Sequence, residues 1–454
     1  MPTNVAYGID LAVLARTLCE LGAVQQLRDL GTHGPLVASA GADSLFHRLF
    51  GRDAIRMAMD LIEDFPSVAR ATVLELARLQ GVRTNPRADE EPGRMLHEHH
   101  QGDDPRALGD SKYWDWPYYG AADTTPQWVN LLTAYSALYG MEILDEPLTD
   151  RLDRHITLRH SLQAAVEWIT RRLDDPAGAG YLWVRRASPV GSRNQVWEDS
   201  SFAYHYEDGA LLDPTQPLVP VALQGYAYDA LVGAADLLEQ SSEGGSPLAT
   251  ELRQRASGLR MRVLSTFWQP DLGTFAHAVT IQAGGSTRPA RVVASAPGHL
   301  LASRLLDGPD AAALRETLIA RFQQPDLLAG AGIRTKSTGA PRFQPGSYHN
   351  GSTWPMDTGV IADGLRRHGH DTQADDLETR ILRACAVVGG FPEFFRGDVD
   401  GSVSINVKLI EIDIDGQVHF QEQPPQARQG WTATRVWRIL RRRGVHLPDG
   451  GVLR

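Results

Sequence analysis

Cysteine is almost absent from this chain of 454 residues, which contains only Cys19 and Cys385. Two cysteines are too few for a disulfide scaffold or for a cysteine-ligated metal site. The first residues also lack the basic start, the continuous apolar core and the small-residue cleavage site of an export signal. We therefore expect a protein of the reducing cytoplasm.

Long hydrophobic runs are missing too, and no stretch approaches the roughly 18 apolar residues that a membrane span needs. Basic charge is not in excess, because 45 Lys and Arg face 55 Asp and Glu, for a net charge of −10. Such a chain repels polyphosphates and anionic lipids. The sequence therefore predicts neither a membrane protein nor a nucleic-acid partner. Lysine itself is rare and occurs only at Lys112, Lys336 and Lys408.

Apolar residues recur mostly at the spacing of one helix face, in segments separated by loops rich in Gly, Pro and Asp. With 42% hydrophobic and 22% charged residues, the composition is that of a globular protein. We expect an all-α fold. The predicted helices cover 9–31, 52–63, 65–80, 125–141, 151–174, 218–239, 246–267, 295–305, 310–322, 354–368, 371–388 and 429–442.

Strand-like alternation is clearest in the segment 403–420, where Asp415-Gly416 predicts a tight turn. We interpret it as a β-hairpin inserted near the C-terminus. No Ser/Gly-rich or Pro-rich linker divides the chain, so residues 1–454 are expected to form one domain. An even number of helices, joined by long and short loops in alternation, favours an (α/α)6 barrel (toroid) over a generic helical array. The sequence does not decide between a monomer and a homo-oligomer.

The unusual residues are concentrated in the long loops, which are rich in aromatics, carboxylates and histidines. A pyranose offers an apolar face that stacks on aromatic rings and a rim of hydroxyls that bonds to charged groups. Loops held at one mouth of a toroid would therefore bind a carbohydrate. These loops are 46–53, 97–128, 194–208, 346–357 and 391–431. The expected aromatic contacts are Trp114, Trp116, Tyr118, Tyr119, Trp128, Trp197, Tyr204, Tyr226, Tyr348 and Trp354. The expected polar contacts are Arg52, Asp53, His97, Glu98, Asp123, Gln224, His299, His349, Asn350, Asp357 and Arg428.

Hydrolysis of a glycosidic bond needs one protonated carboxyl for the leaving oxygen and a second carboxylate on the opposite face of the sugar. Asp199 is the first candidate for the acid, because the nearby Trp197 would exclude water and raise the pKa of a carboxyl. Glu198 is the alternative candidate for the acid. In an extended loop these neighbours point opposite ways, so only one of them can face the substrate.

The second carboxylate is either Glu393 in GGFPEFFRG or Glu422 in HFQEQPPQ. We favour Glu393, because it follows the predicted end of a helix at Gly389-Gly390 and because Pro392 restricts the backbone before it. Glu422 is the alternative base. For each carboxylate the competing interpretation is a structural ion pair with an arginine.

A metal site or a cofactor is not predicted. The cluster His97, Glu98, His99, His100 and Asp103 differs from the HExxH motif, and no second His or Cys cluster completes a coordination shell. No GxxxxGK[ST] phosphate loop and no GxSxG nucleophile elbow occurs. Nucleotide chemistry and serine hydrolysis therefore have no local support.

Nine sequence motifs follow one another along the chain. They are FGRDA at 50–54, LHEHHQGD at 96–103, YYGAADTTPQWVNLL at 118–132, NQVWEDS at 194–200, VALQGYAYDA at 221–230, APGHLL at 296–301, GIRT at 332–335, SYHNGSTWPMDTGVIADGLRRHG at 347–369 and FPEFFRG at 391–397. With them, residues 45–440 resemble the bacterial glycogen-debranching, amylo-α-1,6-glucosidase-like glycoside hydrolases. The resemblance implies an (α/α)6 barrel and an inverting mechanism on α-glucosidic bonds. It implies that Asp199 is the acid and Glu393 the base, and that the glycone is lined by Arg52, Asp53, Asp123, His349 and Asn350.

The chain departs from this family in three places. Glu198 stands where the family usually has Lys, Arg428 stands where it usually has Trp, and residues 1–45 are too few for its N-terminal β-rich domain. A small α-glucoside with a charged or short aglycone is therefore an equal alternative to polymeric glycogen. The inserted hairpin would narrow the site, and Glu422 or Arg428 at its base would contact the aglycone.

Two other classes of function stay open. A sugar isomerase or epimerase uses the same toroid with pairs of histidines, for which His97, His99, His299 and His349 are available. A non-catalytic carbohydrate-binding protein would need the aromatic and polar contacts without a working pair of carboxylates.

Overall fold

The computed structural model describes residues 35–40, 46–99, 114–240, 246–405, 408–414, 417–423 and 425–445. The predicted helix 9–31 lies outside these residues. Among the described residues, no helix is long and apolar enough to cross a bilayer. The division of the chain into a single domain stays a prediction, as does its cytoplasmic location.

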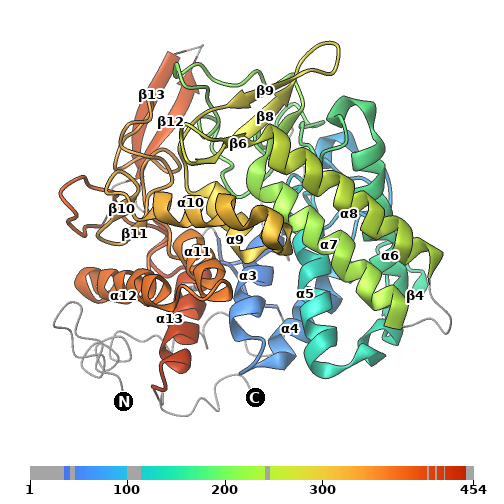
Figure 1. The fold of residues 1–454 in the computed structure, drawn as a ribbon. Helices are drawn as coiled ribbons and strands as arrows, with labels where there is room; N and C mark the ends of the chain where they lie inside the picture. The colour runs from blue at the N-terminus through green and yellow to red at the C-terminus, as the bar shows by residue number, and fades with distance from the viewer. Residues whose placement is uncertain are drawn as a thin grey trace.

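Six helices form a closed inner ring (Figure 1). Each packs against the next in chain order, and the last packs against the first. Their order is α3 (Gly51–Leu61), α5 (Thr124–Tyr139), α7 (Val221–Gln240), α9 (His299–Ala302), α11 (Pro355–Arg367) and α13 (Gly430–Arg442). The predicted (α/α)6 toroid is confirmed.

An outer layer of helices covers the ring. Its described members alternate with the inner helices along the chain, and most pack on the inner helix before them. They are α4 (Pro66–Arg78), α6 (Leu158–Asp174), α8 (Pro247–Thr266), α10 (Ala312–Phe322) and α12 (Asp371–Val388). Local chemistry sets several of their starts. The Ser246 hydroxyl caps α8 by accepting from the Ala249 N–H, and proline occupies the first turn of α4 and α8.

Two predicted helices are shorter than expected. The segment 151–174 becomes helical only at Leu158, because the Asp150 carboxylate accepts the N–H groups of Leu152 and Arg154 and closes a turn instead. The segment 295–305 is broken into α9 and two flanking 3-10 turns, since Pro297 has no N–H and the Ser303 hydroxyl accepts from the N–H of Leu305. The apolar spacing alone does not reveal either break.

Short antiparallel strands lie in the loops. The strands β5 (Leu218–Pro220), β8 (Ala278–Ile281) and β9 (Thr287–Ala290) form one sheet in the order β5-β8-β9, so the predicted helix 218–239 begins as a strand. The predicted hairpin is present as β12 (Lys408–Ile414) and β13 (Gln417–Gln423), in which Leu409 faces Glu422. Its predicted turn, Asp415-Gly416, lies outside the described residues. The other strands form two-stranded pairs: β1 (Leu49–Phe50) with β2 (Glu98–His99), β3 (Pro147–Thr149) with β4 (His155–Thr157), β6 (Trp268–Gln269) with β7 (Thr274–Phe275), and β10 (Leu328–Ala329) with β11 (Gly332–Ile333).

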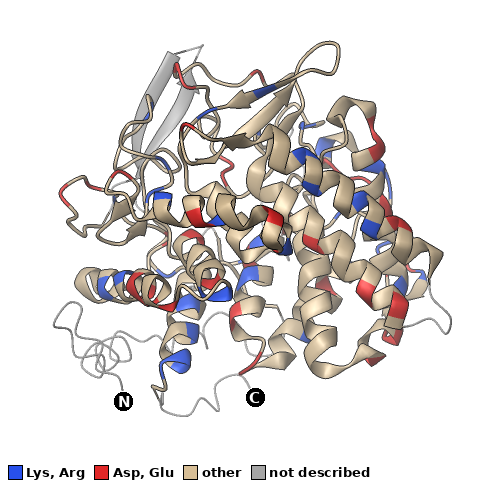
Figure 2. Ribbon diagram, in the orientation of Figure 1, with Lys and Arg blue, Asp and Glu red and all other residues tan. Residues whose placement is uncertain are grey.

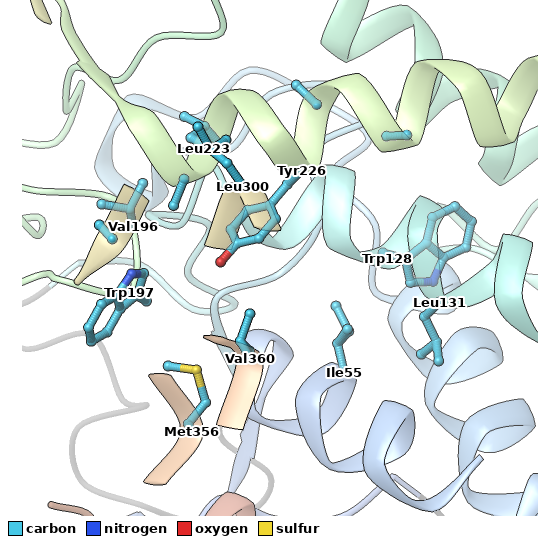
Figure 3. Packing of buried hydrophobic residues seen from close by; sticks show 14 of the residues in the cluster. Ile55, Trp128, Leu131, Val196, Trp197, Leu223, Tyr226, Leu300, Met356 and Val360 are labelled. Atoms are coloured by element: carbon cyan, nitrogen blue, oxygen red, sulfur yellow. The ribbon is translucent and has the colours of Figure 1, made fainter. Parts of the chain in front are cut away.

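One apolar cluster fills the space between the two layers and reaches the centre of the ring. Figure 3 shows Ile55 of α3, Trp128 of α5, Tyr226 of α7 and Val360 of α11 among its members. Burial of this surface is the main favourable term in folding. It holds the ends of the inner helices in fixed positions.

Buried ion pairs close the ring between its last and first helices. Arg435 of α13 contacts Asp60 of α3 at 2.8 Å and Asp363 of α11 at 2.7 Å. Arg438 and Arg442 each reach Asp363 at 3.0 Å. Figure 2 shows basic residues, drawn in blue, on the helix that Figure 1 labels α13. Burial alone would raise the pKa of Asp363, but the three guanidinium groups outweigh it and hold that pKa well below its usual range.

Asp363→Asn should therefore lower the free energy of unfolding by about 3 kcal/mol at pH 7, because it removes the buried carboxylate that Arg435, Arg438 and Arg442 share. The pKa of Asp363 is lowered in the folded state, so its contribution is complete above about pH 4 and is lost as the pH falls further. Urea unfolding at pH 7 and pH 3 measures this, and the difference between the variant and the parent should be smaller at pH 3 than at pH 7. Asp145→Asn, which removes an exposed pair with Arg159, is the control and should cost less than about 1 kcal/mol. A difference for Asp363→Asn that is equally large at both pH values would contradict the ion-pair explanation.

Candidate active site

The candidate site lies where the inner helices begin. Arg52 and Asp53 occupy the first turn of α3, Asp123 is the N-cap of α5, Asp357 is in the first turn of α11, and Gln429 is the N-cap of α13. Backbone N–H groups at these ends have no partner within their helices, so the ring presents several positive helix ends to one region. Side chains that are far apart in sequence meet there.

Arg52 and Asp53 belong to an acidic cluster with three further acidic residues, Asp123, Asp199 and Glu393. The Arg52 guanidinium holds Asp123 with two hydrogen bonds of 2.9 and 3.1 Å, and both side chains are buried. Burial alone would lower the pKa of Arg52, but the charges of Asp123, Asp199 and Asp53 raise it. Arg52 therefore stays charged and neutralises part of the cluster.

In the loop 194–200, the side chain of Glu198 is buried, whereas Asp199 is partly exposed. Glu198 is fully buried, and its carboxylate accepts from Lys336 Nζ at 2.6 Å and from His277 Nε2 at 2.6 Å. These partners outweigh burial and hold the pKa of Glu198 well below its usual range. Asp199 is partly exposed and acts electrostatically on Arg52, Asp53 and Tyr348. Of the two neighbours, Asp199 is the one in the acidic cluster.

Glu393 enters the cluster from the loop after α12. That helix ends at Gly389, whose φ of 71° is left-handed, as expected for a glycine C-cap. The backbone of Glu393 then pairs with Gln426, since its N–H donates to the Gln426 carbonyl at 2.9 Å. Its carboxylate accepts a short hydrogen bond from the Tyr348 hydroxyl and a longer one of 3.4 Å from the Gln426 N–H. The pKa of Tyr348 is raised by burial and by Glu393, so the tyrosine remains a donor.

Asp53 interacts electrostatically with both candidate catalytic carboxylates, Asp199 and Glu393. Its Oδ1 accepts from Gln429 Nε2 at 2.9 Å. Burial, together with the charges of Glu393 and Asp199, raises the pKa of Asp53 to about 7, although Arg52 and Gln429 oppose the shift. Near neutral pH this carboxyl is therefore divided between its protonated and charged forms.

Asp53→Asn should make the folded protein more stable at pH 8 than at pH 5, relative to the parent. The folded-state pKa of about 7 exceeds the ordinary 3.8, so the parent loses stability as the pH rises through 7, by up to about 4 kcal/mol. Asparagine does not ionise and can still accept from Gln429. Thermal unfolding at the two pH values measures the gain, and the exposed Asp271→Asn serves as the control. Equal gains at both pH values would contradict a buried, titrating Asp53.

Aromatic rings form a wall beside the cluster. Trp197 stacks on His299 with ring centroids 5.7 Å apart, and Trp354 stacks on His349 at 5.1 Å. Trp197 also meets Trp354 edge to face at 5.9 Å. In Figure 3, Tyr226 projects from α7 near Trp197, and its hydroxyl makes a short hydrogen bond with His299 Nδ1. The predicted rings Trp197, Tyr226 and Trp354 therefore come together.

His299 connects this wall to α11. Its Nε2 bonds to Asp357 Oδ1 at 2.7 Å, so both ring nitrogens of His299 are engaged by Tyr226 and Asp357. His349 Nδ1 lies 2.9 Å from the Ser200 hydroxyl. Asn350 is buried and donates to the Phe202 carbonyl at 3.1 Å. These predicted residues surround the site, and Asn350 also fixes the loop behind it.

Several residues predicted to contact the substrate bond to other parts of the protein and do not belong to the acidic cluster. The Gln224 amide is fully used by the backbone of Leu182 and Pro220, at distances of 2.7 to 3.1 Å. The Tyr119 hydroxyl donates to the Leu79 carbonyl at 2.6 Å. Of the framework residues around the site, Glu98 pairs with Arg48 at 2.7 Å, and His97 is buried between Phe50 and Tyr118. Burial and the charge of Arg52 lower the pKa of His97, so it is neutral.

The other predicted residues lie at the edge of what the structure describes. Arg428 is exposed, and its carbonyl accepts from the Ala40 N–H at 3.0 Å. The backbone of Glu422 lies in β13, while its side chain is outside the described part, so its role stays a prediction. His100 and Asp103 are also outside it. Among the described residues, no group of three His, Cys, Asp or Glu side chains could hold a metal ion.

The sequence interpretation did not identify Lys336, His277 and Gln429 as parts of the site. Lys336 and His277 act through Glu198, and Gln429 bonds to Asp53. Lysine is so rare in this chain that its occurrence directly after the GIRT motif could have identified Lys336 as a candidate residue of the site. For His277 and Gln429 no pattern in the sequence pointed to the site.

A toroid of paired helices with carboxylates and aromatic rings gathered at the helix starts is an architecture that glycoside hydrolases use. The family model for the mannosylglycerate hydrolase MGH1-like glycoside hydrolase domain matches residues 61–402, and the chain belongs to this family. The expected glycoside hydrolase class is thus confirmed, while the match is to this family and not specifically to the glycogen-debranching enzymes. No curated protein matches the chain.

Solved structures share the fold at low sequence identity. The GH63 mannosylglycerate hydrolase from Thermus thermophilus, in complex with Tris and D-glycerate, is 15% identical with a TM-score of 0.62, over 94% of this chain and 100% of that one. An uncharacterised conserved protein from the same organism is 17% identical with a TM-score of 0.59, over 92% and 98%. A glycosidase variant in complex with glucose is 17% identical with a TM-score of 0.56, over 97% and 100%.

Proposed function

We propose that this glycoside hydrolase is an inverting α-glycosidase in which Asp199 is the general acid and Glu393 the general base. The observation that carries the proposal is the meeting of these two carboxylates, from separate loops, around Arg52 and Asp53. Inverting enzymes need one protonated and one charged carboxyl about 6.5–9.5 Å apart, with room for a water molecule. Asp199 is the more exposed of the two and can reach a leaving oxygen.

In the proposed reaction, Asp199 donates its proton to the glycosidic oxygen as the bond to the anomeric carbon breaks. Glu393 takes a proton from water, whose oxygen attacks the same carbon from the opposite face. The hydrogen bond from Tyr348 orients the Glu393 carboxylate. The Arg52–Asp123 pair and the rings of Trp197 and Trp354 would hold the glycone.

For the substrate, we propose a small α-glucoside or α-mannoside with a short acidic aglycone of the glycerate type. The family description and the complex of a similarly folded enzyme with D-glycerate support this choice. The exposed Arg428, at the base of the hairpin, supplies a positive charge near the loop of Glu393, because it pairs in parallel with Phe391. A branched α-1,6-glucan is the competing substrate.

The histidine geometry favours hydrolysis over isomerisation. An isomerase or epimerase needs histidines that exchange protons with the sugar. Both nitrogens of His299 are instead bonded to Tyr226 and Asp357, and His97 is kept neutral by burial. These residues are better suited to shaping the site than to proton transfer.

The test is incubation of the protein with α-glucosylglycerate, α-mannosylglycerate, isomaltose and a branched α-1,6-glucan, followed by proton NMR of the anomeric signals. We expect a free sugar whose first-formed anomer is β, from a glycerate-type glycoside. Release of the α anomer first would refute inversion. Cleavage of the branched glucan in preference to the glycerates would show that the substrate is a branched α-1,6-glucan, as for debranching enzymes. Conversion of the sugar without release of an aglycone would show that the protein is an isomerase or epimerase and not a hydrolase.

A further inference from the structure

We propose that Lys336 is a positioning residue that joins the loop of the general acid to the loop that orients the general base. The inference rests on the proposed roles of Asp199 and Glu393. Lys336 would set the separation of the two carboxyl groups, on which an inverting mechanism depends.

Lys336 is completely buried, and its ammonium group bonds to partners in two different loops. Nζ donates to Glu198 Oε1 at 2.6 Å and to the backbone carbonyl of His349 at 3.0 Å. Its own segment is fixed by an antiparallel bridge to Ala294. A buried ammonium costs several kcal/mol unless it is paired and hydrogen-bonded. The ammonium group therefore resists separation from either loop.

On the acid side, Glu198 transmits this constraint to Asp199. Its second oxygen accepts from His277 Nε2 at 2.6 Å and from the Tyr204 hydroxyl at 3.3 Å. Tyr204 and His277 stack face to face with centroids 4.3 Å apart. A side chain held at both oxygens fixes its own backbone, so the direction of the adjacent Asp199 is fixed as well.

On the base side, His349 transmits the constraint to Glu393. The residue before it, Tyr348, donates to the Glu393 carboxylate. A second tie links the same two loops, since His349 Nδ1 lies 2.9 Å from the hydroxyl of Ser200, the residue after Asp199. The path from acid to base therefore runs through Glu198, Lys336, His349 and Tyr348. Each step along it is a peptide bond or a hydrogen bond.

The cation of this connection comes from neither of the two loops that it joins. Lys336 lies in a third segment, which pairs with Ala294. Placing the cation on a third segment allows it to hold both loops at once.

Lys336→Met, which keeps the length of the side chain and removes its charge, should lower kcat about 100-fold while KM changes less than about threefold, because misplacement by about 1 Å costs this much in rate. Rates are taken per folded molecule, with the folded fraction from circular dichroism, on the glycoside that the parent hydrolyses fastest in the NMR panel. Asp363→Asn, at the ring closure, is the control for a lost buried charge and should keep the parental kcat per folded molecule. A parental kcat for Lys336→Met would overturn the proposal.

The double variant Glu198→Lys/Lys336→Glu separates positioning from simple charge pairing. It restores an ion pair between the two segments, and its Tm should exceed that of Lys336→Met. Its kcat should stay low, because glutamate cannot donate to the His349 carbonyl. Full recovery of kcat would overturn the role of the link to His349. Glu198→Gln, which keeps the shape, provides a milder variant should the others not fold; its kcat should fall about tenfold, and a parental value would overturn the link to the acid.

A crystal structure of Lys336→Met tests the inference without any enzymatic assay. We expect the distance between the Asp199 and Glu393 carboxyl carbons to change by about 1 Å or more relative to the parent. An unchanged distance would overturn the positioning role even if the parent is an active glycosidase. Conversely, a parent that hydrolyses no glycoside would refute the proposed function and leave this structural result to stand alone.

Discussion

Glu393→Gln should lower kcat by about a hundredfold to ten-thousandfold, the range that a general base contributes. The loss should be the same for good and poor leaving groups, because the base acts on water and not on the departing aglycone. Glutamine can still accept from the Tyr348 hydroxyl, so the fold should be unaffected. Steady-state rates on a natural glycoside and on a 2,4-dinitrophenyl glycoside of the same sugar measure the effect. Azide, which attacks without losing a proton, should restore part of the rate on the activated substrate.

Glu422→Gln is the matched control, because it makes the same substitution at the other candidate base. We expect it to retain kcat within about threefold, with any change confined to KM through the aglycone. If Glu422→Gln abolishes turnover while Glu393→Gln does not, the role of the base passes to the hairpin.

Asp199→Asn should lower kcat much more on the natural glycoside than on the 2,4-dinitrophenyl glycoside, whereas Glu393→Gln should lower kcat equally on both. An aliphatic alcohol leaves poorly without a proton, so kcat on the natural glycoside should fall by about a thousandfold or more. Dinitrophenolate leaves without protonation, and the loss on that substrate should stay below about tenfold. The high-pH limb of the pH–rate profile should disappear as well, since the group that must be protonated is gone.

The comparison with Glu393→Gln is the control for Asp199→Asn, because both remove one carboxylate of the acidic cluster and its charge acting on Asp53. Equal losses on the natural and activated substrates would mean that Asp199 is not the acid. Asp53, whose pKa is raised to about 7 in the same cluster, would then be the next candidate.

Much of the fold followed from local patterns in the sequence. Helices such as α5 and α12 appear within one or two residues of their predicted limits, because their apolar residues mark one buried face throughout. The errors arose where a single side chain overrides the pattern. The carboxylate of Asp150 closes a turn inside the predicted helix 151–174, and Pro297 interrupts 295–305.

The sequence predicted which carboxylates come together in the candidate site. It was a poorer guide to the residues that hold them in place. Motif residues Arg52, Asp123, Asp199 and Glu393 come together as a loop cluster should. Gln224 shows the limit of residue type as a guide, because an amide suited to sugars is used entirely by the backbone of Leu182 and Pro220. Lys336 shows the opposite case, since its partner Glu198 is 138 positions away and only the folded ring places them together.

A ribosome must finish nearly the whole chain before this protein can turn over a substrate. Asp53 leaves the tunnel early, but its partner Gln429 follows 376 positions later, and α13 must then dock on α3. At about 5–20 residues per second, that delay is roughly 20 to 75 seconds. A nascent chain stopped after Phe395 already carries Asp199 and Glu393, yet it lacks Gln426, Gln429 and the last helix of the ring. Hydrolytic activity should therefore appear only after α13 has been synthesised and has docked on α3, which makes it a direct reporter of ring closure.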